Sequence, residues 1–473
     1  MITTAPVDMD LRIPRADLRE TPWFQPRTIS ILNKPVEGDL VQAKLLPKLI
    51  KAFREQGHIV SEQPDGNVNL MIAFYDVPDT DASLIERIPE RQLPLALTLM
   101  REYKLARRPD NLVLFLTIRE RPSEMKHTDM IELSRTAMAR AGSPKVVFLS
   151  GDRETGELWE STYTTMEGGH PSDKAEERDV VLMLRDRLIA MACARDVGAD
   201  YIVIDNQVSK EQWETTRTPE ALIAAGHRMD TLNLLPAPKN VSEYVSPDLA
   251  NIYNRYLNMK GFSEGMLFAF DPETQTLMVT ASGSWNVDKR ALKREEVVPI
   301  GGMEEHKILV YAPEGIKPKG PSVEAVEMYT LLMSVPKTRV RKNADGVWVA
   351  DPNGDVEVPM IRGGVHTHVG VTHIDEEWVE DMGLNRRDYP YGFGCGTDLM
   401  KQLAQDAAHR SKAIHDPDDP RLYVRWQMLY HGETVVELWK EGASDQPLQG
   451  LLDMYDPQRV GAIEYTYDHI DQP

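Results

Sequence analysis

Cysteine is scarce in this chain, which contains only Cys193 and Cys395 among its 473 residues. Two cysteines so far apart in sequence argue against a disulfide-rich scaffold and suit a reducing compartment. Long apolar runs are also lacking, because no segment approaches the roughly 18 continuous apolar residues of a membrane helix. Residues 1–27 contain no apolar stretch preceded by basic residues, so no secretory signal is predicted. We therefore expect a cytoplasmic protein without a membrane partner.

Dense basic segments are missing as well. The chain has 54 lysines and arginines against 74 aspartates and glutamates, which gives a formal net charge of -20 at pH 7. Such a chain lacks the basic footprint of a nucleic-acid-binding protein, and an anionic membrane surface would repel it. Hydrophobic residues make up 41% of the chain, which is enough for real cores, and the length suits two or three domains.

The amino-terminal half alternates short apolar runs with stretches of helical periodicity. The apolar runs are 29–32, 68–74, 112–118, 146–149 and 201–204, and the helical stretches lie near 39–56, 91–107, 123–141 and 176–197. This alternation predicts βαβ units around a mostly parallel sheet. We expect a Rossmann-like α/β domain over residues 28–240, preceded by an amino-terminal extension over 1–27. Its boundary falls in the proline-rich segment 234–240.

Ligands of parallel sheets usually bind beyond the carboxyl ends of the strands. In this chain none of those ends contains the Gly-x-Gly-x-x-Gly loop that cradles a dinucleotide phosphate. Dinucleotide binding is therefore not predicted, and the role of the first domain stays open. After the boundary we expect a helix over 249–259 and, further on, an inserted hairpin over 337–358.

The carboxyl-terminal half contains a pair of histidines in an apolar, β-branched setting. The segment reads Gly363-Gly364-Val365-His366-Thr367-His368-Val369-Gly370. Alternate side chains of a strand point to one face, so His366 and His368 would face the same space, where two imidazoles can bind one metal ion. His373 is a rival further ligand, but its strand parity is opposite, so it could join them only if the chain bends at Gly370.

Three further motifs stand in order around this pair. Upstream, Thr280-Ala281-Ser282-Gly283 ends a strand in a turn of small residues. Next, Pro321-Ser322-Val323-Glu324 opens a helix whose apolar face consists of Ala325, Met328, Tyr329 and Leu332. Downstream of the histidine pair, Tyr430-His431-Gly432 interrupts an apolar strand. The order of the four motifs is more specific than any one of them.

This succession resembles the class II aldolase/adducin family. Its zinc enzymes have a Thr-Pro-Ser-Gly turn, a Pro-Ser-Ser-Glu helix start, a His-Thr-His strand and a later Asn-His-Gly strand. The resemblance covers roughly residues 243–445, less than half of the chain. It implies that residues 241–473 form an α/β/α domain with a central, mainly antiparallel sheet.

The resemblance also implies a metal site. His366, His368 and His431 would bind Zn²⁺ or another divalent metal ion, and Glu324 would be the catalytic acid/base. Three neutral imidazoles leave one open position on a tetrahedral ion, as a catalytic zinc requires. Family members build their sites at the subunit interfaces of symmetric tetramers, so we expect a homo-oligomer, a tetramer by resemblance.

The family's phosphate-binding residues are only partly present. The first turn reads Gly261-Phe262-Ser263-Glu264 where sugar-phosphate enzymes have Gly-Asn-x-Ser, and Val323 replaces the second serine before the glutamate. Glu264 would repel a phosphate. A reduced polar pocket remains, made of Ser263, Ser282, Gly283 and Ser322. We expect a small-molecule substrate without phosphate, sugar-like or a hydroxy-keto acid.

The predicted function is that of a metal-dependent lyase, an aldolase that breaks or forms a carbon–carbon bond beside a hydroxy-ketone. An epimerase or a decarboxylase with the same metal site is an alternative that motif spacing cannot separate from it. A non-catalytic, adducin-like scaffold is the other alternative. The presence of all three histidines and of Glu324 favours catalysis over the scaffold.

Overall fold

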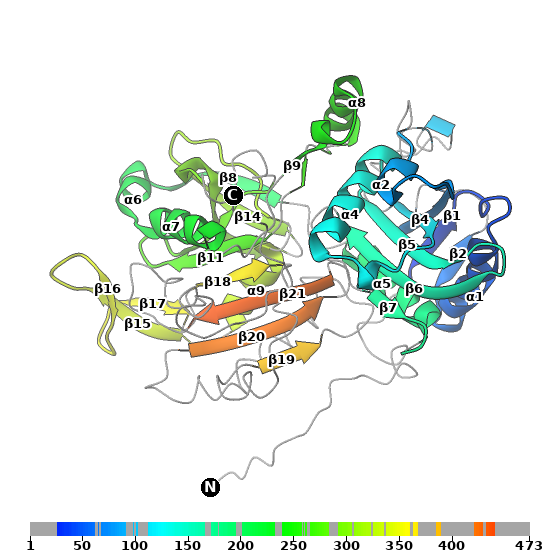
Figure 1. Cartoon of the computed structure of the whole chain (residues 1–473). Coiled ribbons are helices and arrows are strands. Elements are labelled where there is room, and N and C mark those ends of the chain that lie inside the picture. The colour runs from blue at the N-terminus through cyan, green and yellow to red at the C-terminus, as the bar shows by residue number, and fades with distance from the viewer. Residues whose placement is uncertain are drawn as a thin grey trace, which may run out of the picture.

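Two large β-sheets organise the chain in the computed structural model (Figure 1). The structure describes residues 26–61, 65, 68–90, 98, 101–102, 112–165, 172–177, 179–194, 201–231, 239–257, 259, 261–262, 265–282, 292–304, 307–322, 325–334, 337–359, 363–367, 385–388, 421–428 and 432–439. Helices and strands are mixed in both halves, so the predicted α/β class is confirmed. No helix in this part of the chain is long and apolar enough to cross a membrane.

The first sheet has seven strands. In spatial order they are β2 (Ile59–Ser61), β1 (Thr28–Ile31), β3 (Leu70–Tyr75), β4 (Leu112–Ile118), β5 (Lys145–Asp152), β6 (Glu157–Thr165) and β7 (Ser172–Lys174). The first five strands run parallel, and β6 and β7 are added antiparallel. The predicted parallel sheet is thus present. Strands β3 and β4 are buried along their whole length, which explains their unbroken apolar sequences.

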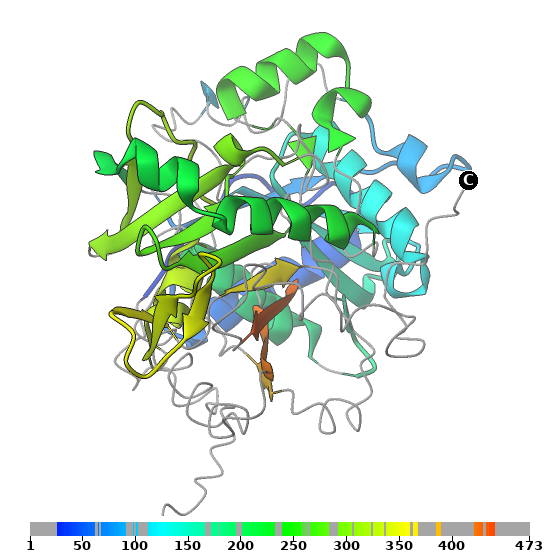
Figure 2. The same cartoon turned by 90° about the vertical axis from the view of Figure 1, so that its left-hand side faces the viewer.

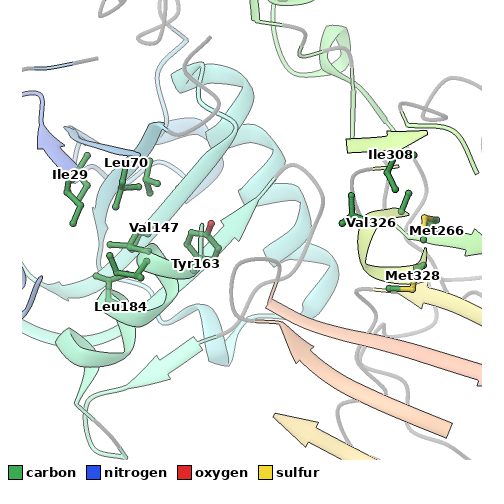
Figure 3. Close-up of a cluster of buried hydrophobic side chains, with 14 of the residues drawn as sticks. Ile29, Leu70, Val147, Tyr163, Leu184, Met266, Ile308, Val326 and Met328 are labelled. Atoms are coloured by element: carbon green, nitrogen blue, oxygen red, sulfur yellow. The ribbon is translucent and has the colours of Figure 1, made fainter. Parts of the chain in front are cut away.

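Helices cover both faces of this sheet. On one face α1 (Leu40–Glu55) packs with α5 (Val180–Ala194); on the other, α4 (His127–Ala141) follows the 3₁₀ turn η2 (Pro122–Glu124) and packs with α2 (Leu84–Arg87). Successive side chains of a strand point to opposite faces of the sheet and so contribute to both layers. In β4, Phe115 packs on the α1 side and Leu114 on the α4 side. Figure 3 shows part of this core, including Leu70 and Val147.

The second sheet has nine strands and is mainly antiparallel. In spatial order they are β19 (Asn385–Asp388), β20 (Arg421–Met428), β21 (Gly432–Trp439), β18 (Gly363–Thr367), β11 (Met266–Asp271), β12 (Thr276–Thr280), β13 (Val297–Glu304), β14 (Lys307–Pro313) and β8 (Tyr201–Val208). Only the two outermost pairs, β19 with β20 and β14 with β8, run parallel. The strand directions match the mainly antiparallel sheet that was expected for the carboxyl-terminal half.

Three helices accompany the second sheet. They are α6 (Lys210–Thr215), α7 (Thr218–Thr231) and α9 (Ala325–Ser334), and the 3₁₀ turn η7 (Arg294–Glu296) precedes β13. Helix α7 lies against β11 and β12, and α9 lies against β13 and β14. In Figure 2, viewed from the side of this sheet, α6 and α7 (green) lie across its front. The buried side chains of α9 include Val326 and Met328, which join the core in Figure 3.

The strand predicted at 201–204 belongs to the second sheet, which corrects its assignment to the first. Strand β8 pairs in parallel with β14 and forms the edge of the nine-stranded sheet. An apolar run predicts a strand but does not say which sheet the strand joins, because that depends on contacts far away in sequence. Helices α6 and α7 follow β8 directly and stay with the second sheet.

Residues 239–262 then return to the first unit. This segment contains β9 (Lys239–Asn240), η3 (Val241–Glu243), α8 (Pro247–Ile252), the π-helical turn η4 (Tyr253–Leu257) and β10 (Gly261–Phe262). The Tyr244 hydroxyl lies 2.9 Å from both carboxylate oxygens of Glu132 in α4, and the Tyr253 hydroxyl donates to the carbonyl of Ala139. The helix predicted over 249–259 is confirmed for 249–257, because α8 begins at Pro247 and η4 ends at Leu257. Over the residues that the structure describes, the chain thus crosses between the two units three times.

A small third sheet occupies the region of the predicted hairpin. It consists of β16 (Trp348–Ala350), β15 (Lys337–Lys342) and β17 (Val356–Pro359), all antiparallel. The hairpin is confirmed, and β17 adds a third strand to it. In the chain this sheet stands between α9 and β18, and none of its strands joins the second sheet.

Candidate functional site

Two of the predicted substrate-binding serines are brought onto adjacent backbone segments. The end of β12 continues into an isolated antiparallel bridge between Ala281 and Pro321. The Ser282 amide donates to the Gly320 carbonyl at 2.9 Å, and the Ser322 amide donates to the Thr280 carbonyl at 3.4 Å. Ser282 is exposed and Ser322 is partly buried. The described parts of the motifs around residues 280–283 and 321–324 therefore meet where β12 ends. In this site, "edge" means the side of the nine-stranded sheet that is formed by these strand ends, not by an outer strand.

The histidine strand ends at the same edge. In β18, His366 is opposite Met266, the first residue of β11, and opposite Val436 of β21. The Leu267 amide donates to the Thr280 hydroxyl at 3.3 Å, which aligns the start of β11 with the end of β12. Neighbouring strands lie about 5 Å apart, so the backbone at His366 is about 10 Å from the end of β12. The end of β18 and the two serine-containing segments therefore lie at the same end of the sheet's strands.

The remaining predicted site residues lie outside the described residues. They are Glu324, His368, His431, Ser263 and Gly283, together with the rival ligand His373; for His366 only the strand backbone is described. Their neighbours are placed, however. Thr367 ends β18 just before residue 368, Gly432 begins β21 just after residue 431, and Ala325 begins α9 just after residue 324.

The strand register sets a condition for the third metal ligand. Thr367, the last residue of β18, is opposite Val435, so the first residue of β21, Gly432, is three positions further toward this edge. Three residues of strand span about 10 Å. A metal bound by His366 and His368 therefore needs the chain to bend at this edge to bring in His431 or His373. The register leaves both histidines open as the third ligand.

Helix α9 starts at this edge and points its amino-terminal end toward it. The Ala325 amide donates to the Ser322 carbonyl at 3.1 Å. The predicted apolar face is confirmed, because Ala325, Met328 and Leu332 are buried and Tyr329 is half-buried. Burial raises the pKa of Tyr329, helped by Tyr311 beside it, so its phenol stays neutral. The positive end of the helix dipole favours negative charge at the candidate site.

Sequence reasoning missed a charged pair at this edge. The Lys319 ammonium pairs with the carboxylate of Glu296, whose own backbone carbonyl accepts the Ala281 amide at 2.8 Å. The Lys319 side chain is 47% exposed, whereas that of Glu296 is 5% exposed. The second Glu296 oxygen is buried and accepts no hydrogen bond from the described residues. A lysine directly before the Gly320-Pro321-Ser322 turn was the available sequence signal.

The carboxyl edge of the parallel sheet offers a contrast. Here the side chain of Asn33, which follows β1, binds the backbone of Phe74 in β3. Its Nδ2 donates to the Phe74 carbonyl at 2.9 Å, and its Oδ1 accepts from the Phe74 backbone amide at 2.7 Å. Arg153 pairs with Asp39, which caps α1, at 3.1 Å and with Asp76 at 2.7 Å. These polar groups at the carboxyl ends of the parallel strands thus bind one another.

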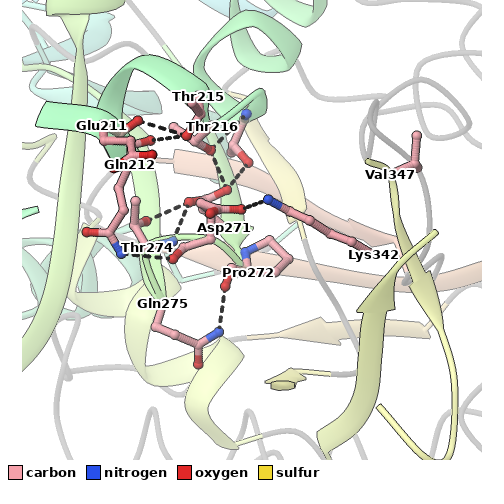
Figure 4. Close-up of polar contacts among 12 residues, drawn as sticks. Glu211, Gln212, Thr215, Thr216, Asp271, Pro272, Thr274, Gln275, Lys342 and Val347 are labelled. Atoms are coloured by element: carbon pink, nitrogen blue, oxygen red, sulfur yellow. Dashed lines mark hydrogen bonds and ion pairs between the residues drawn. The ribbon is translucent and has the colours of Figure 1, made fainter. Parts of the chain in front are cut away.

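A second polar cluster lies at the opposite edge of the nine-stranded sheet (Figure 4). Asp271, the last residue of β11, accepts the Thr216 and Thr218 hydroxyls at 2.6 and 2.7 Å on one oxygen. Its other oxygen accepts the Thr274 amide at 2.8 Å and the Thr274 hydroxyl at 2.6 Å. Asp271 is buried with both oxygens satisfied, so the cluster fastens the α6–α7 junction to the sheet and is structural.

Among the described residues, no group of three or more His, Cys, Asp or Glu side chains is placed to hold a metal ion. The imidazoles of the predicted ligands are not in that part of the chain. As a donor set, three neutral imidazoles fit zinc, and the convergence of their strands at one edge is compatible with a shared ion. No family model matches this chain, and no curated protein matches it either.

Proposed function

We propose that this chain is a metal-dependent lyase of the class II aldolase type, acting on an unphosphorylated hydroxy-keto acid. One observation carries the proposal: the end of β12, the Pro321 turn, the end of β18 and the start of β21 all lie toward one edge of the second sheet, the edge formed by these strand ends. These are the four places where the family-like motifs stand. In this proposal the second unit has the aldolase-like fold, and the first unit is a Rossmann-like domain that supports it.

The chemistry follows from the residue types. His366, His368 and a third histidine would hold a divalent ion, which supplies Lewis-acid stabilisation of negative charge on substrate oxygens. Glu324, the residue before α9 in the sequence, moves a proton to or from the carbon where the bond breaks. The Ser282 and Ser322 hydroxyls orient the substrate by hydrogen bonds. The start of α9 adds a dipole that favours an anionic substrate.

The position and charge of Lys319 support a carboxylic acid as the substrate. Its ammonium lies at the same edge as Ser282 and Ser322 and is half-exposed, so a carboxylate can reach it. Glu296 beneath it fixes the position of the ammonium, and as a second charge it offsets part of the attraction for a doubly charged phosphate. A carboxylate of single charge fits this pair better than a phosphate monoester.

The first test measures metal binding and turnover together. Metal-free protein is titrated with Zn²⁺ by calorimetry, and the loaded protein is given 4-hydroxy-2-keto acids, neutral hydroxy-ketones and their phosphorylated counterparts. We expect about one ion per chain and retro-aldol products from the keto acids, detected by NMR. His368→Ala should abolish metal binding. Comparison of His431→Ala with His373→Ala identifies the third ligand, since only the true ligand's loss weakens binding strongly.

Glu324→Gln separates catalysis from metal binding within the same experiment. The variant keeps the size of the side chain but cannot move a proton, so turnover should fall about 10²- to 10⁴-fold while the zinc content persists. Carbon dioxide release or substrate inversion without cleavage would instead identify the decarboxylase or the epimerase. A protein that binds no divalent ion and turns over no substrate would be a scaffold, and the proposal would be wrong.

A further inference from the structure

The edge strand β8 presents an unusual run of exposed apolar side chains. Tyr201, Ile202 and Val203 are 43%, 38% and 40% exposed, and they are consecutive. Only three other large hydrophobic residues of the described chain are comparably exposed, and they are scattered: Leu40, Ile59 and Tyr256. Single exposed apolar residues are ordinary, whereas here Tyr201 and Val203 on one face of the strand and Ile202 on the other leave both faces of this edge apolar and exposed.

The backbone of β8 is also unpaired on one side. Strand β8 pairs with β14 and is the last strand of the sheet, so in the described structure its outer hydrogen-bonding groups face no other strand. Natural edge strands are usually protected by lysines, prolines or bulges. Residues 201–205 contain no lysine, arginine or proline, and Asp205 is their only charge. The pairing with β14 is regular over residues 201–204 and then shifts in register before Val208, and Asn206 has a φ of 56°, so Asp205 lies just beyond the regular edge.

We propose that β8 pairs in an antiparallel manner with β8 of a second copy of this chain, joining two nine-stranded sheets across a two-fold axis at Val203. In this register Val203 faces Val203 of the partner, Ile202 faces Ile204, and Tyr201 faces Asp205. Every position of the regular edge 201–204 then has a partner, and Asp205, just beyond it, is the partner of Tyr201. The apolar, β-branched residues face one another, as strand pairing favours.

Charge and symmetry favour a second copy of this chain as the partner of β8. The chain has a net charge of -20, so most of its surface repels a second copy, but the 201–205 edge has a single acid. The register places Asp205 opposite the phenol of Tyr201 and away from its own symmetry mate, so no like charges meet. An antiparallel pair of identical strands is self-complementary and closes as a dimer, without growing into a fibre. This inference does not depend on the proposed enzymatic function.

The first experiment compares Val203→Lys with Ile59→Lys by light scattering after size exclusion. Ile59 is 59% exposed in β2, the edge strand of the first sheet, and serves as the matched control. The parent chain should assemble with at least twice its mass of 53.6 kDa. Val203→Lys should halve the assembled mass, because two ammonium groups would meet on the axis, and Ile59→Lys should leave it unchanged. Circular dichroism checks that both variants are folded.

The second experiment fixes the register and does not require disruption of the fold. Directly opposed residues of antiparallel strands have Cα atoms about 4.5–5.5 Å apart, which a disulfide can bridge. In a chain with Cys193 and Cys395 replaced by serine, Val203→Cys should form a covalent dimer on mild oxidation, whereas Asp205→Cys should not. A monomeric parent chain, an unchanged mass for folded Val203→Lys, or equal cross-linking at both positions would overturn the proposal. A peptide or another protein would then be the partner to seek.

Discussion

At the scale of single residues, Lys319 is the side chain whose replacement separates recognition of the substrate's charge from the chemical step. Lys319 directly precedes the Gly320-Pro321-Ser322 turn, whose Gly320 carbonyl accepts the Ser282 amide, and its ammonium is held by the buried carboxylate of Glu296. Lys319→Met should raise KM for hydroxy-keto acids about 10- to 100-fold, the value of one charge-assisted hydrogen bond, with kcat nearly unchanged. Steady-state kinetics with a keto acid and a neutral hydroxy-ketone measure this.

Lys317 provides the matched control, because it is an exposed lysine two residues earlier on the same turn. Lys317→Met should leave both KM values unchanged. Equal losses for the acidic and the neutral substrate in Lys319→Met would mean that Lys319 only stabilises the turn through Glu296. The carboxylate selectivity assigned to this site would then be withdrawn, while the metal-dependent lyase activity could stand.

The residues of the candidate site differ in how far the sequence could predict them. Ser282 and Ser322 were predicted from motifs whose order along the chain is informative, and the structure brings their backbones together. Glu296 and Lys319 were not predicted, because they are 23 residues apart and meet only after the chain turns back from β14. Pairing that depends on a long turn leaves no periodic signal in the sequence.

At the scale of elements, the segment 239–262 is fastened to α4 by two tyrosines whose protonation opposes unfolding. Burial raises the pKa of Tyr253, with Tyr75 and Glu90 adding to the effect. Burial and the negative charge of Glu132 raise the pKa of Tyr244 in the same direction. Folded phenols therefore keep a proton that the unfolded chain loses near pH 10, and stability falls as the pH rises above that value.

Tyr253→Phe should reduce this alkaline loss. For a fully buried tyrosine the slope of unfolding free energy is at most about 1.4 kcal/mol per pH unit above pH 10, and the variant should lack that contribution. Urea unfolding between pH 8 and pH 11.5 measures the slope. Tyr256→Phe, an exposed tyrosine of the same π-helical turn, should keep the parent's slope. Equal slopes in the parent and Tyr253→Phe would show that this phenol does not govern alkaline unfolding.

The elements also show where sequence patterns suffice. Strands β3 and β4 and helix α1 were predicted nearly to their ends, because burial on two faces or on one helical stripe leaves a clear apolar pattern. Strand β8 was placed in the wrong sheet. Its run Tyr-Ile-Val-Ile reads like a buried parallel strand, yet it is an exposed edge. The apolar residues of β8 are exposed at the surface. Hydropathy alone cannot distinguish such an exposed apolar strand from a buried one.

At the scale of the whole molecule, the two units are interleaved along the chain. Residues 201–231 belong to the second sheet, although they precede the segment 239–262 that packs on the first unit. A proline-rich break at 234–240 is a sound signal of a change in structure. It did not indicate the three crossings between the units that the described residues make, because each crossing is fixed by long-range packing and leaves no mark in local composition.

Truncation tests this interleaving. A fragment from Ser242 lacks β8, α6 and α7, so it exposes the side of β11 and β12 that α7 covers and removes Thr216 and Thr218 from buried Asp271. Loss of a hydrogen bond to a buried charged group costs about 1–3 kcal/mol, and two are lost here. The fragment should be insoluble or lack a cooperative thermal transition, whereas one starting at Tyr201 should be better folded. If the Ser242 fragment melts cooperatively with the parent's oligomeric state, residues 201–231 are dispensable and the predicted boundary at 240 is a true folding boundary.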